Sequence, residues 1–148
     1  MKDKGIFMIE RTLMMIKPDA VQRSIIGKII TRIENKGLKI VGLKLIRLSS
    51  DDVDKLYDIH IKKDFYTKLR DFILSGPVVA IAIEGKDAVS VVRTLAGVTD
   101  SVKAAPGTIR GDFGLHLTKN IVHTSDAVAR ASYELNVLFN PEEIIENK

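Results

Sequence analysis

One short stretch of this sequence combines residue types suited to covalent chemistry. It runs from Asn120 to Asp126 and reads Asn-Ile-Val-His-Thr-Ser-Asp, which places one of the three histidines, His123, beside hydroxyl residues. The chain has no cysteine, and a neutral imidazole near pH 7 is the best nucleophile that the remaining residue types offer. His123 is therefore the first candidate for a residue that forms a covalent intermediate.

The composition limits the class of protein. The 148 residues are 45% hydrophobic and 28% charged, which suits one domain whose core needs no metal or disulfide to fold. The absence of cysteine from the sequence excludes disulfides, cysteine-ligated zinc and thiol catalysis. We expect a single domain over residues 1–148, with an N-terminal extension at residues 1–8 and a polar C-terminal tail at residues 141–148.

The charge pattern suits a small anionic substrate. The net charge is +4 and the pI is near 9.3, which attracts phosphates and also permits weak attraction to nucleic acid. Acidic residues lie between the lysines and arginines, and aromatic residues make up only 5% of the chain. This pattern argues against a dedicated nucleic-acid binder. The apolar runs are far shorter than the roughly 20 residues that a membrane helix requires, so we expect a cytoplasmic protein that does not enter a membrane.

Alternating strand-like and helix-like segments must position these residues. Apolar patterns predict strands at residues 12–16, 38–46, 78–83 and 121–123. Helical spacing of apolar residues predicts helices at residues 24–35, 53–61, 66–74 and 88–95, and a last helix to residue 138 that Ser125 or Asp126 would cap. Residues 97–114 hold several glycines without periodicity, which indicates a long ordered loop. Helices packed on a sheet follow from this order, whereas spacing alone leaves the strand order open.

Five segments taken together resemble the motif series of the nucleoside diphosphate kinase family. They are Lys17-Pro18-Asp19, Tyr57, Arg93 to Thr99, Pro106 to Phe113, and Asn120 to Asp126. The resemblance covers about residues 9 to 143, in order and without a gap. It implies an α+β fold, a ferredoxin-like α/β sandwich in which helices cover an antiparallel sheet. It also implies an enzyme that moves the γ-phosphate of a nucleoside triphosphate to a nucleoside diphosphate by a ping-pong route through phospho-His123.

The resemblance assigns catalytic roles around this histidine. Glu134 is similar to the family glutamate that binds the other ring nitrogen, which would fix the imidazole tautomer. Ser125 resembles the serine that supports the pair, although a helix cap explains it equally well. Lys17 and Tyr57 match the lysine and tyrosine that contact the phosphoryl group in transit, where they would stabilise the transition state electrostatically.

The resemblance also implies a nucleotide site. The residues similar to the family's phosphate, sugar and base contacts are Lys17, Arg93, Thr99, Arg110, Asn120, Phe65, Leu69 and Leu117. Among these, the arginines match phosphate oxygens, Asn120 the sugar, and Phe65 a base that stacks with little regard to its identity. A Mg²⁺ ion would bridge the β- and γ-phosphates, held mainly by substrate oxygens and water rather than by protein ligands.

Some positions depart from the family pattern. Thr124 and Ala127 stand where the family usually has glycine and serine, and Asp100-Ser101 where many members have Asn-Pro. A β-branched residue at 124 would be strained if the backbone there needed a positive φ. A nucleotide-binding protein without turnover therefore stays open as an alternative, as does a nucleic-acid role suggested by the basic pI. The family assembles as hexamers or tetramers, so we expect a homo-oligomer of either kind.

Overall fold

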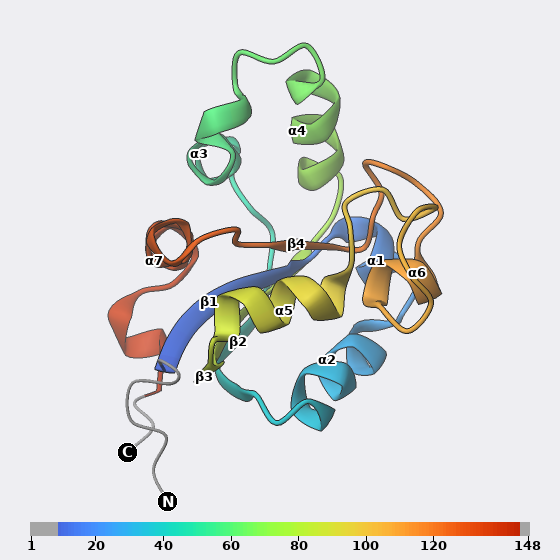
Figure 1. The fold of residues 1–148 in the computed structure, drawn as a ribbon. Coiled ribbons are helices and arrows are strands. Elements are labelled where there is room, and N and C mark those ends of the chain that lie inside the picture. The colour runs from blue at the N-terminus through green and yellow to red at the C-terminus, as the bar shows by residue number, and fades with distance from the viewer. Residues whose placement is uncertain (1–8, 146–148) are drawn as a thin grey trace, which may run out of the picture.

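The computed structural model describes residues 9–145 (Figure 1). The strands are β1 (Ile9–Ile16), β2 (Lys39–Ile46), β3 (Val78–Lys86) and β4 (Val122–Thr124). The helices are α1 (Pro18–Gln22), α2 (Ile26–Asn35), α3 (Ser50–Leu56), α4 (Tyr66–Leu74), α5 (Ala88–Ala96), α6 (Ile109–Phe113) and α7 (Val128–Leu138), with 3-10 turns η1 (Asp58–His60) and η2 (Pro141–Glu143). Each long predicted element is present within about three residues of its expected bounds, except that the helix expected over residues 53–61 ends at Leu56 and is followed by the separate 3-10 turn η1.

The four strands form one antiparallel sheet in the order β2-β3-β1-β4. Strand β1 is central and pairs on both sides, so that Met14 lies opposite Ile81 on β3 and Thr124 on β4. Helix α2 connects β1 to β2, and α5 connects β3 to β4. This order and these connections are those of a ferredoxin-like α+β fold, which confirms the predicted fold class and supplies the strand order that spacing left open.

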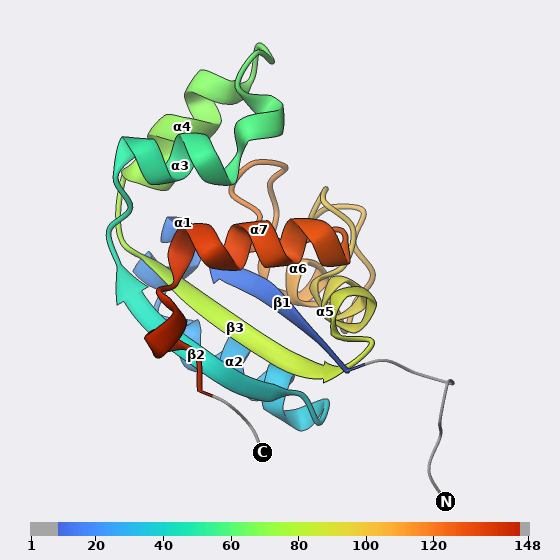
Figure 2. The same ribbon diagram turned by 90° about the vertical axis from the view of Figure 1, so that its left-hand side faces the viewer.

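The sheet separates two hydrophobic cores, because successive side chains of a strand point to opposite faces. Leu13 and Met15 pack with α3, α4 and α7 on one face. Met14 and Ile16 pack with α1, α2 and α5 on the other. Figure 2 shows α7 crossing in front of the sheet while α2 lies behind it. Helices α3 and α4 form a hairpin that rises away from the sheet at the top of Figure 1.

Two short helices are additions to the predicted elements. Helix α1 begins with Pro18 at its first turn, and α6 lies inside the segment expected to be a loop. Thr108 caps α6, because its hydroxyl oxygen accepts a hydrogen bond of 2.9 Å from the Gly111 amide. Helices of five residues are too short to show a period in the sequence. Their signals are local instead, namely proline at a first helical position and threonine at an N-cap.

The predicted cap of the last helix is wrong. Neither Ser125 nor Asp126 caps α7; the N-cap is Ala127, whose extended backbone has φ −159° and ψ 159°. The methyl group of alanine cannot accept a hydrogen bond from the first-turn amides, so this end of the helix lacks a side-chain cap of its own. The Ser125 hydroxyl is instead turned toward Glu134.

The C-terminal segment lies along the edge strand β2. The Ile145 amide donates to the Val41 carbonyl at 2.8 Å, and Lys44 pairs with Glu143 at 2.8 Å. The expected N-terminal extension, residues 1–8, and residues 146–148 of the expected tail fall outside the described residues. Within residues 9–145, no helix combines the length and apolarity needed to cross a membrane.

Candidate active site

A cleft of about 810 Å³ opens between the α3–α4 hairpin and the chain from α5 to β4. All the predicted site residues except Ser125 and Glu134 line it. They are Lys17, Tyr57, Phe65, Leu69, Arg93, Thr99, Arg110, Leu117, Asn120 and His123. Segments far apart in the sequence thus meet at one cavity, with the two remaining residues directly behind the histidine.

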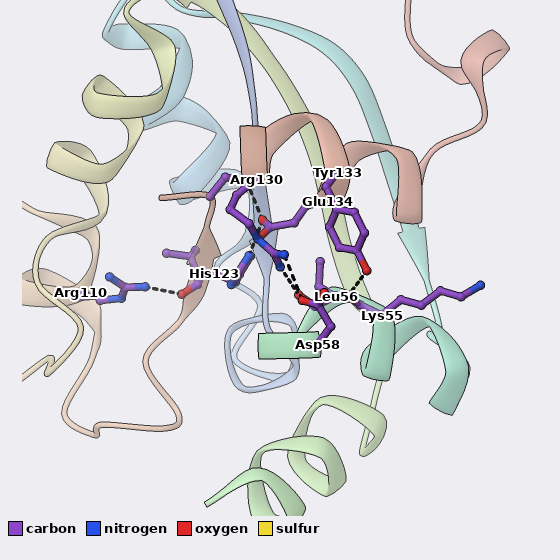
Figure 3. Close-up of polar contacts among 10 residues, drawn as sticks. Lys55, Leu56, Asp58, Arg110, His123, Arg130, Tyr133 and Glu134 are labelled. Atoms are coloured by element: carbon purple, nitrogen blue, oxygen red, sulfur yellow. Dashed lines mark hydrogen bonds and ion pairs between the residues drawn. The ribbon is translucent and has the colours of Figure 1, made fainter. Parts of the chain in front are cut away.

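His123 is held from behind by a buried carboxylate. It lies in β4 opposite Met15 of β1, and its Nε2–H donates to Glu134 Oε1 at 2.8 Å (Figure 3). The Ser125 hydroxyl donates to the same oxygen at 2.6 Å. Glu134 is only 3% exposed. Burial by itself would raise its pKa, but hydrogen bonds from His123 and Ser125 and the charge of Arg130 outweigh it and lower the pKa.

This arrangement selects one imidazole tautomer. An ionised Glu134 only accepts hydrogen bonds, so the proton between the two groups belongs to His123 Nε2. Nδ1 then carries the free lone pair of the neutral ring, and that ring lines the cleft. Of the two interpretations of Ser125, the hydroxyl contact favours the supporting role over the helix cap. The site offers a nucleophilic nitrogen with fixed orientation.

Tyr57 stands beside the histidine ring. The two ring centroids are 5.2 Å apart at an interplanar angle of 75°. The Tyr57 hydroxyl is buried and has no hydrogen-bond partner among residues 9–145. Burial, followed by the charge of Glu134, raises its pKa, so the phenol stays neutral. A buried donor without a partner is costly, and an oxygen of a ligand in the cleft would supply the missing acceptor.

Lys17 is a buried cation at the end of β1. It is 6% exposed, and its ammonium group donates to Asn120 Oδ1 at 2.7 Å. Burial, reinforced by the nearby charge of Arg110, lowers its pKa to about 7, against an opposite effect of Asp19. Near neutral pH the group is therefore poised between its neutral and charged forms. A phosphate in the cleft would favour the charged form.

Arg110 connects three backbone segments at the inner end of the cleft. Its guanidinium donates to the carbonyls of Gly97 at 2.7 Å, Val122 at 2.7 Å and Asn120 at 3.2 Å. Burial lowers its pKa to about 10, which still leaves it charged at neutral pH. Gly97 adopts φ +88°, and a Cβ there would lie 2.6 Å from the Thr108 hydroxyl. The backbone at 97 therefore requires glycine in order to present its carbonyl to Arg110.

The strained residue near the histidine is Ile121 and not Thr124. Among the described residues, the non-glycine positions with positive φ are Ser24, Asp87 and Ile121, the last at φ 80°. Thr124 is an ordinary strand residue of β4, so the expected conflict with a β-branched side chain does not arise. Ile121 is held by its carbonyl, which accepts the Lys17 amide at 2.9 Å, and by its own amide, which donates to Asp19 Oδ2 at 3.2 Å.

The outer end of the cleft is apolar and open. Phe65 is 51% exposed and Leu117 61%, while Leu69 is buried beneath them. His60 also lines this end, with its ring centroid 5.5 Å from that of Phe65. His60 is not among the residues that the sequence predicts for the site. It stands three residues after Tyr57, one turn of the 3-10 helix η1, which places both rings on the same side.

Metal ligands are sparse around the cleft. Over residues 9–145, no group of three or more histidine, aspartate or glutamate side chains is placed to hold an ion. The cleft lining includes one carboxylate, that of Asp126. This donor set fits a divalent ion that arrives on substrate phosphates and keeps most of its water.

The fold is of the ferredoxin-like class, and one cleft brings together a histidine, a lysine and two arginines. The family model for nucleoside diphosphate kinases matches residues 10–144. The nucleoside diphosphate kinase of Thermoplasma acidophilum is 50% identical over 94% of this chain and 94% of its own, and that of Archaeoglobus fulgidus is 49% identical over 93% and 91%. The chain belongs to the nucleoside diphosphate kinase family, which confirms the resemblance seen in the motifs.

A solved structure agrees in fold over almost the whole chain. The halophilic nucleoside diphosphate kinase from Halobacterium salinarum, determined in complex with CDP, superposes with a TM-score of 0.92. It is 45% identical, over 95% of this chain and 94% of its own. Sequence and three-dimensional comparison therefore identify the same family.

Proposed function

We propose that the chain transfers the γ-phosphate of a nucleoside triphosphate to a nucleoside diphosphate in two half-reactions through His123. Membership of the family makes the chain an enzyme of this class. The observation that carries the residue assignment is the hydrogen bond from Nε2 to Glu134, which leaves Nδ1 as the nucleophile. The cationic groups at the inner end of the cleft support the same assignment.

Each half-reaction is a displacement at phosphorus. In the first, Nδ1 of His123 attacks the γ-phosphorus, the N–P bond forms, and the bond to the bridging oxygen breaks with its electron pair on the departing diphosphate. In the second, a terminal oxygen of another nucleoside diphosphate attacks the same phosphorus, and the electron pair of the N–P bond returns to Nδ1. Because a neutral imidazole is both nucleophile and leaving group, one residue serves both directions.

Lys17, Arg110 and Tyr57 act on charge during the transfer. Negative charge moves between the bridging and terminal oxygens as bonds change, and fixed donors in a water-poor site stabilise it strongly. Lys17 supplies an ammonium group, because a phosphate in the cleft favours its protonated form. Tyr57 supplies the hydroxyl that lacks a partner in the described residues. Arg110 supplies charge while its carbonyl contacts keep it in place.

The remaining lining residues bind the nucleotide. We assign Arg93 and Thr99 to phosphates, Asn120 to the sugar, and Phe65 to the base, which lies in a slot with Leu69 and Leu117. The solved complex of the Halobacterium salinarum relative with CDP supports a nucleotide in this family's cleft. Stacking on an exposed ring carries little base identity, so we expect the site to accept several bases.

Mg²⁺ is the divalent ion we propose for the reaction. Bound to the β- and γ-phosphates, it would neutralise charge on the transferring group. Asp126 is the one carboxylate of the cleft lining, so it is the side chain that would help to hold the ion. The protein's own part is to orient the phosphates with Lys17, Arg93 and Arg110.

We also propose a cytoplasmic homo-oligomer built from one domain per chain. Strand β2 ends the sheet, and its outer edge has no strand partner among residues 9–145. Leu43 and Leu45 on it are 50% and 62% exposed. The C-terminal segment contacts part of this edge at Val41, and the exposed apolar side chains of the edge strand favour association with another copy. Mass measurement in solution distinguishes a hexamer from a tetramer, and a monomer would refute the assembly.

Labelling tests the proposed reaction. The purified chain is mixed with γ-labelled ATP and Mg²⁺, and the acid-labile label is mapped by peptide analysis. We expect label on His123 that moves to GTP when unlabelled GDP is added. Label on another residue would refute the assignment of His123. Nucleotide binding without any label would favour the alternative of a binding protein without turnover.

A further inference from the structure

Arg130 of α7 links the buried glutamate to the end of α3, and no motif in the sequence marks it. Its Nε donates to Glu134 Oε2 at 3.3 Å, and another nitrogen pairs with Asp58 at 3.0 Å. The third contact is from Nη2 to the Leu56 carbonyl at 3.2 Å. Figure 3 shows the guanidinium between these groups. One side chain thus joins α7, the last turn of α3 and η1.

Tyr133, almost one turn along α7, extends this link. Its hydroxyl donates to the Lys55 carbonyl at 2.8 Å, and the Arg130 guanidinium carbon lies 4.7 Å from the centroid of its ring. The last carbonyls of a helix lack partners within the helix. Here α7 supplies partners to two such carbonyls of α3. We call Arg130 and Tyr133, with these contacts, the α7 clamp.

The α7 clamp reaches both sides of the nucleophile. Behind His123 it fixes Glu134, whose Oε1 is already occupied by His123 and Ser125. Beside His123 it fixes the residue before Tyr57, whose ring lies 5.2 Å from the histidine ring. The clamp residues themselves are not among those that line the cleft. They can therefore fix the positions of the reacting groups without contacting a nucleotide in the cleft.

The charges are arranged so that Glu134 keeps its negative charge. Burial tends to lower the pKa of Arg130, but the carboxylates of Asp58 and Glu134 outweigh it and raise the pKa, so the guanidinium stays charged. Asp58 balances that charge, which leaves one net negative charge among Asp58, Arg130 and Glu134. The carboxylate is then oriented by Arg130 and stays ionised, so it still accepts the hydrogen bond from His123 Nε2–H.

We propose that Arg130 is a positioning residue that sets the rate of His123 phosphorylation through Glu134 and Tyr57, and that does not set nucleotide affinity. The inference rests on the proposed function. Without Arg130, the Glu134 carboxylate loses the hydrogen bond at Oε2 that fixes its rotation, and the end of α3 loses a tie to α7. Small displacements of a reacting group reduce rates strongly because the productive geometry is narrow.

The test compares Arg130→Gln, Arg130→Lys and a matched control. The control is Arg70→Gln, since Arg70 of α4 pairs with Asp54 of α3 at 2.8 Å and makes no hydrogen bond to Glu134. In single-turnover labelling we expect His123 of Arg130→Gln to be phosphorylated roughly tenfold more slowly than His123 of the unchanged chain. The ADP affinity of the variant should stay within about twofold of that of the unchanged chain. Arg130→Lys should recover part of the rate because it keeps the charge. Arg70→Gln should keep the full rate.

A spectroscopic measurement separates positioning from general loss of structure. In ¹⁵N-histidine NMR of the unchanged chain, we expect His123 to carry its proton on Nε2, and in Arg130→Gln we expect a mixture of both tautomers. An unchanged phosphorylation rate in Arg130→Gln, or a loss of ADP affinity equal to the loss of rate, would overturn the proposal. If Arg130→Gln does not fold, Asp58→Asn and Arg130→Lys carry the test, and unchanged rates in both overturn it.

The same experiment distinguishes failure of this inference from failure of the proposed function. If the unchanged chain acquires label on His123 and the clamp variants acquire it at the same rate, only the inference fails. If the unchanged chain acquires no label on His123, the proposed function fails, and the inference fails with it.

Discussion

The two ends of the cleft are built on different principles. At the inner end, Lys17, Asn120 and Arg110 are between 2% and 7% exposed, and hydrogen bonds hold each of them. At the outer end, Phe65 and Leu117 are 51% and 61% exposed. Phosphoryl transfer depends on charges that are fixed in advance, whereas a stacked base needs only an apolar surface. One cleft can therefore hold a phosphate in a fixed position and still accept different bases.

Removing His123, the proposed nucleophile at the inner end, should cost the most activity. We expect His123→Asn to reduce transfer by more than about 10⁴-fold, since loss of a covalent catalyst removes the two-step route. ADP binding, measured by calorimetry, should persist because the phosphate and base contacts remain. His116→Asn, at an exposed position outside this cleft, is the control and should keep full activity. Substantial transfer by His123→Asn would show that the inner end works without its histidine.

Lys17→Met should have the next largest effect on rate. We expect a loss of about 10²- to 10³-fold in phosphorylation of His123, the size typical of a removed transition-state contact. Single-turnover labelling measures it. A loss smaller than that of an outer-end variant would contradict the distinction between the two ends.

The same variant should gain stability at low pH. The folded pKa of Lys17 is about 7, below its ordinary value of 10.5, so the folded chain binds fewer protons between these values and wild-type stability rises with pH there. Below about pH 7 the folded chain bears the full free-energy cost of burying the charged form of Lys17. Lys17→Met should therefore raise the free energy of unfolding at pH 6 by on the order of 2 kcal/mol, after loss of the bond to Asn120. The gain should shrink as pH rises from about 7 to 10. Denaturant unfolding at a series of pH values checks this.

Phe65→Ala tests the outer end and should have a smaller effect. Removing one stacking surface costs about 1–3 kcal/mol of nucleotide binding, so KM should rise roughly tenfold or more while the rate of phosphorylation at saturation stays nearly unchanged. ATP, GTP and CTP should be affected alike. A selective loss for one base would show that the outer end reads base identity after all. Leu117→Ala provides a second variant of the same end.

A change outside the cleft should alter stability slightly and leave both ends untouched. Ala127 occupies the N-cap of α7 without an acceptor in its side chain. Ala127→Ser should increase the free energy of unfolding by about 1 kcal/mol, the usual contribution of a serine cap. Activity should not change, since the serine would act on the helix end and not on the phosphate. Thermal unfolding measures the gain, and Ala129→Ser, past the cap position, is the control. An unchanged or lower unfolding temperature would mean that the first turn is already satisfied.

Much of this molecule can be predicted from the sequence because the chemistry demands particular residue types. A histidine, a lysine and arginines occupy motif positions, so the motifs alone predict His123, Lys17 and Arg110 as site residues, and the structure brings all three to one cleft. The periods of the apolar residues predict the long helices and strands. These signals are local or repeat along the chain, which is why the order of residues is enough to show them.

What the sequence does not reveal depends on three-dimensional neighbours. Thr124 raises a concern about backbone strain, whereas the positive φ falls at Ile121, a residue type that gives no warning of it. Because α7 begins at Val128, Ala127 is the N-cap in place of the expected Ser125 or Asp126, and the hydroxyl of Ser125 donates to Glu134. Arg130 contacts groups on three different elements, and a helix-surface arginine has no signal in the sequence that distinguishes it from a solvated one.

The strain at Ile121 limits which residues natural variation can place there. Its φ of 80° favours glycine, but the side chain is fully buried among those of the α2 and α5 core. Glycine would relax the backbone and leave a cavity, and asparagine would suit the backbone and bury an unpaired amide. No residue type satisfies both requirements. The position therefore sits at a compromise, and a library at 121 screened for activity should return few survivors, mainly isoleucine and valine.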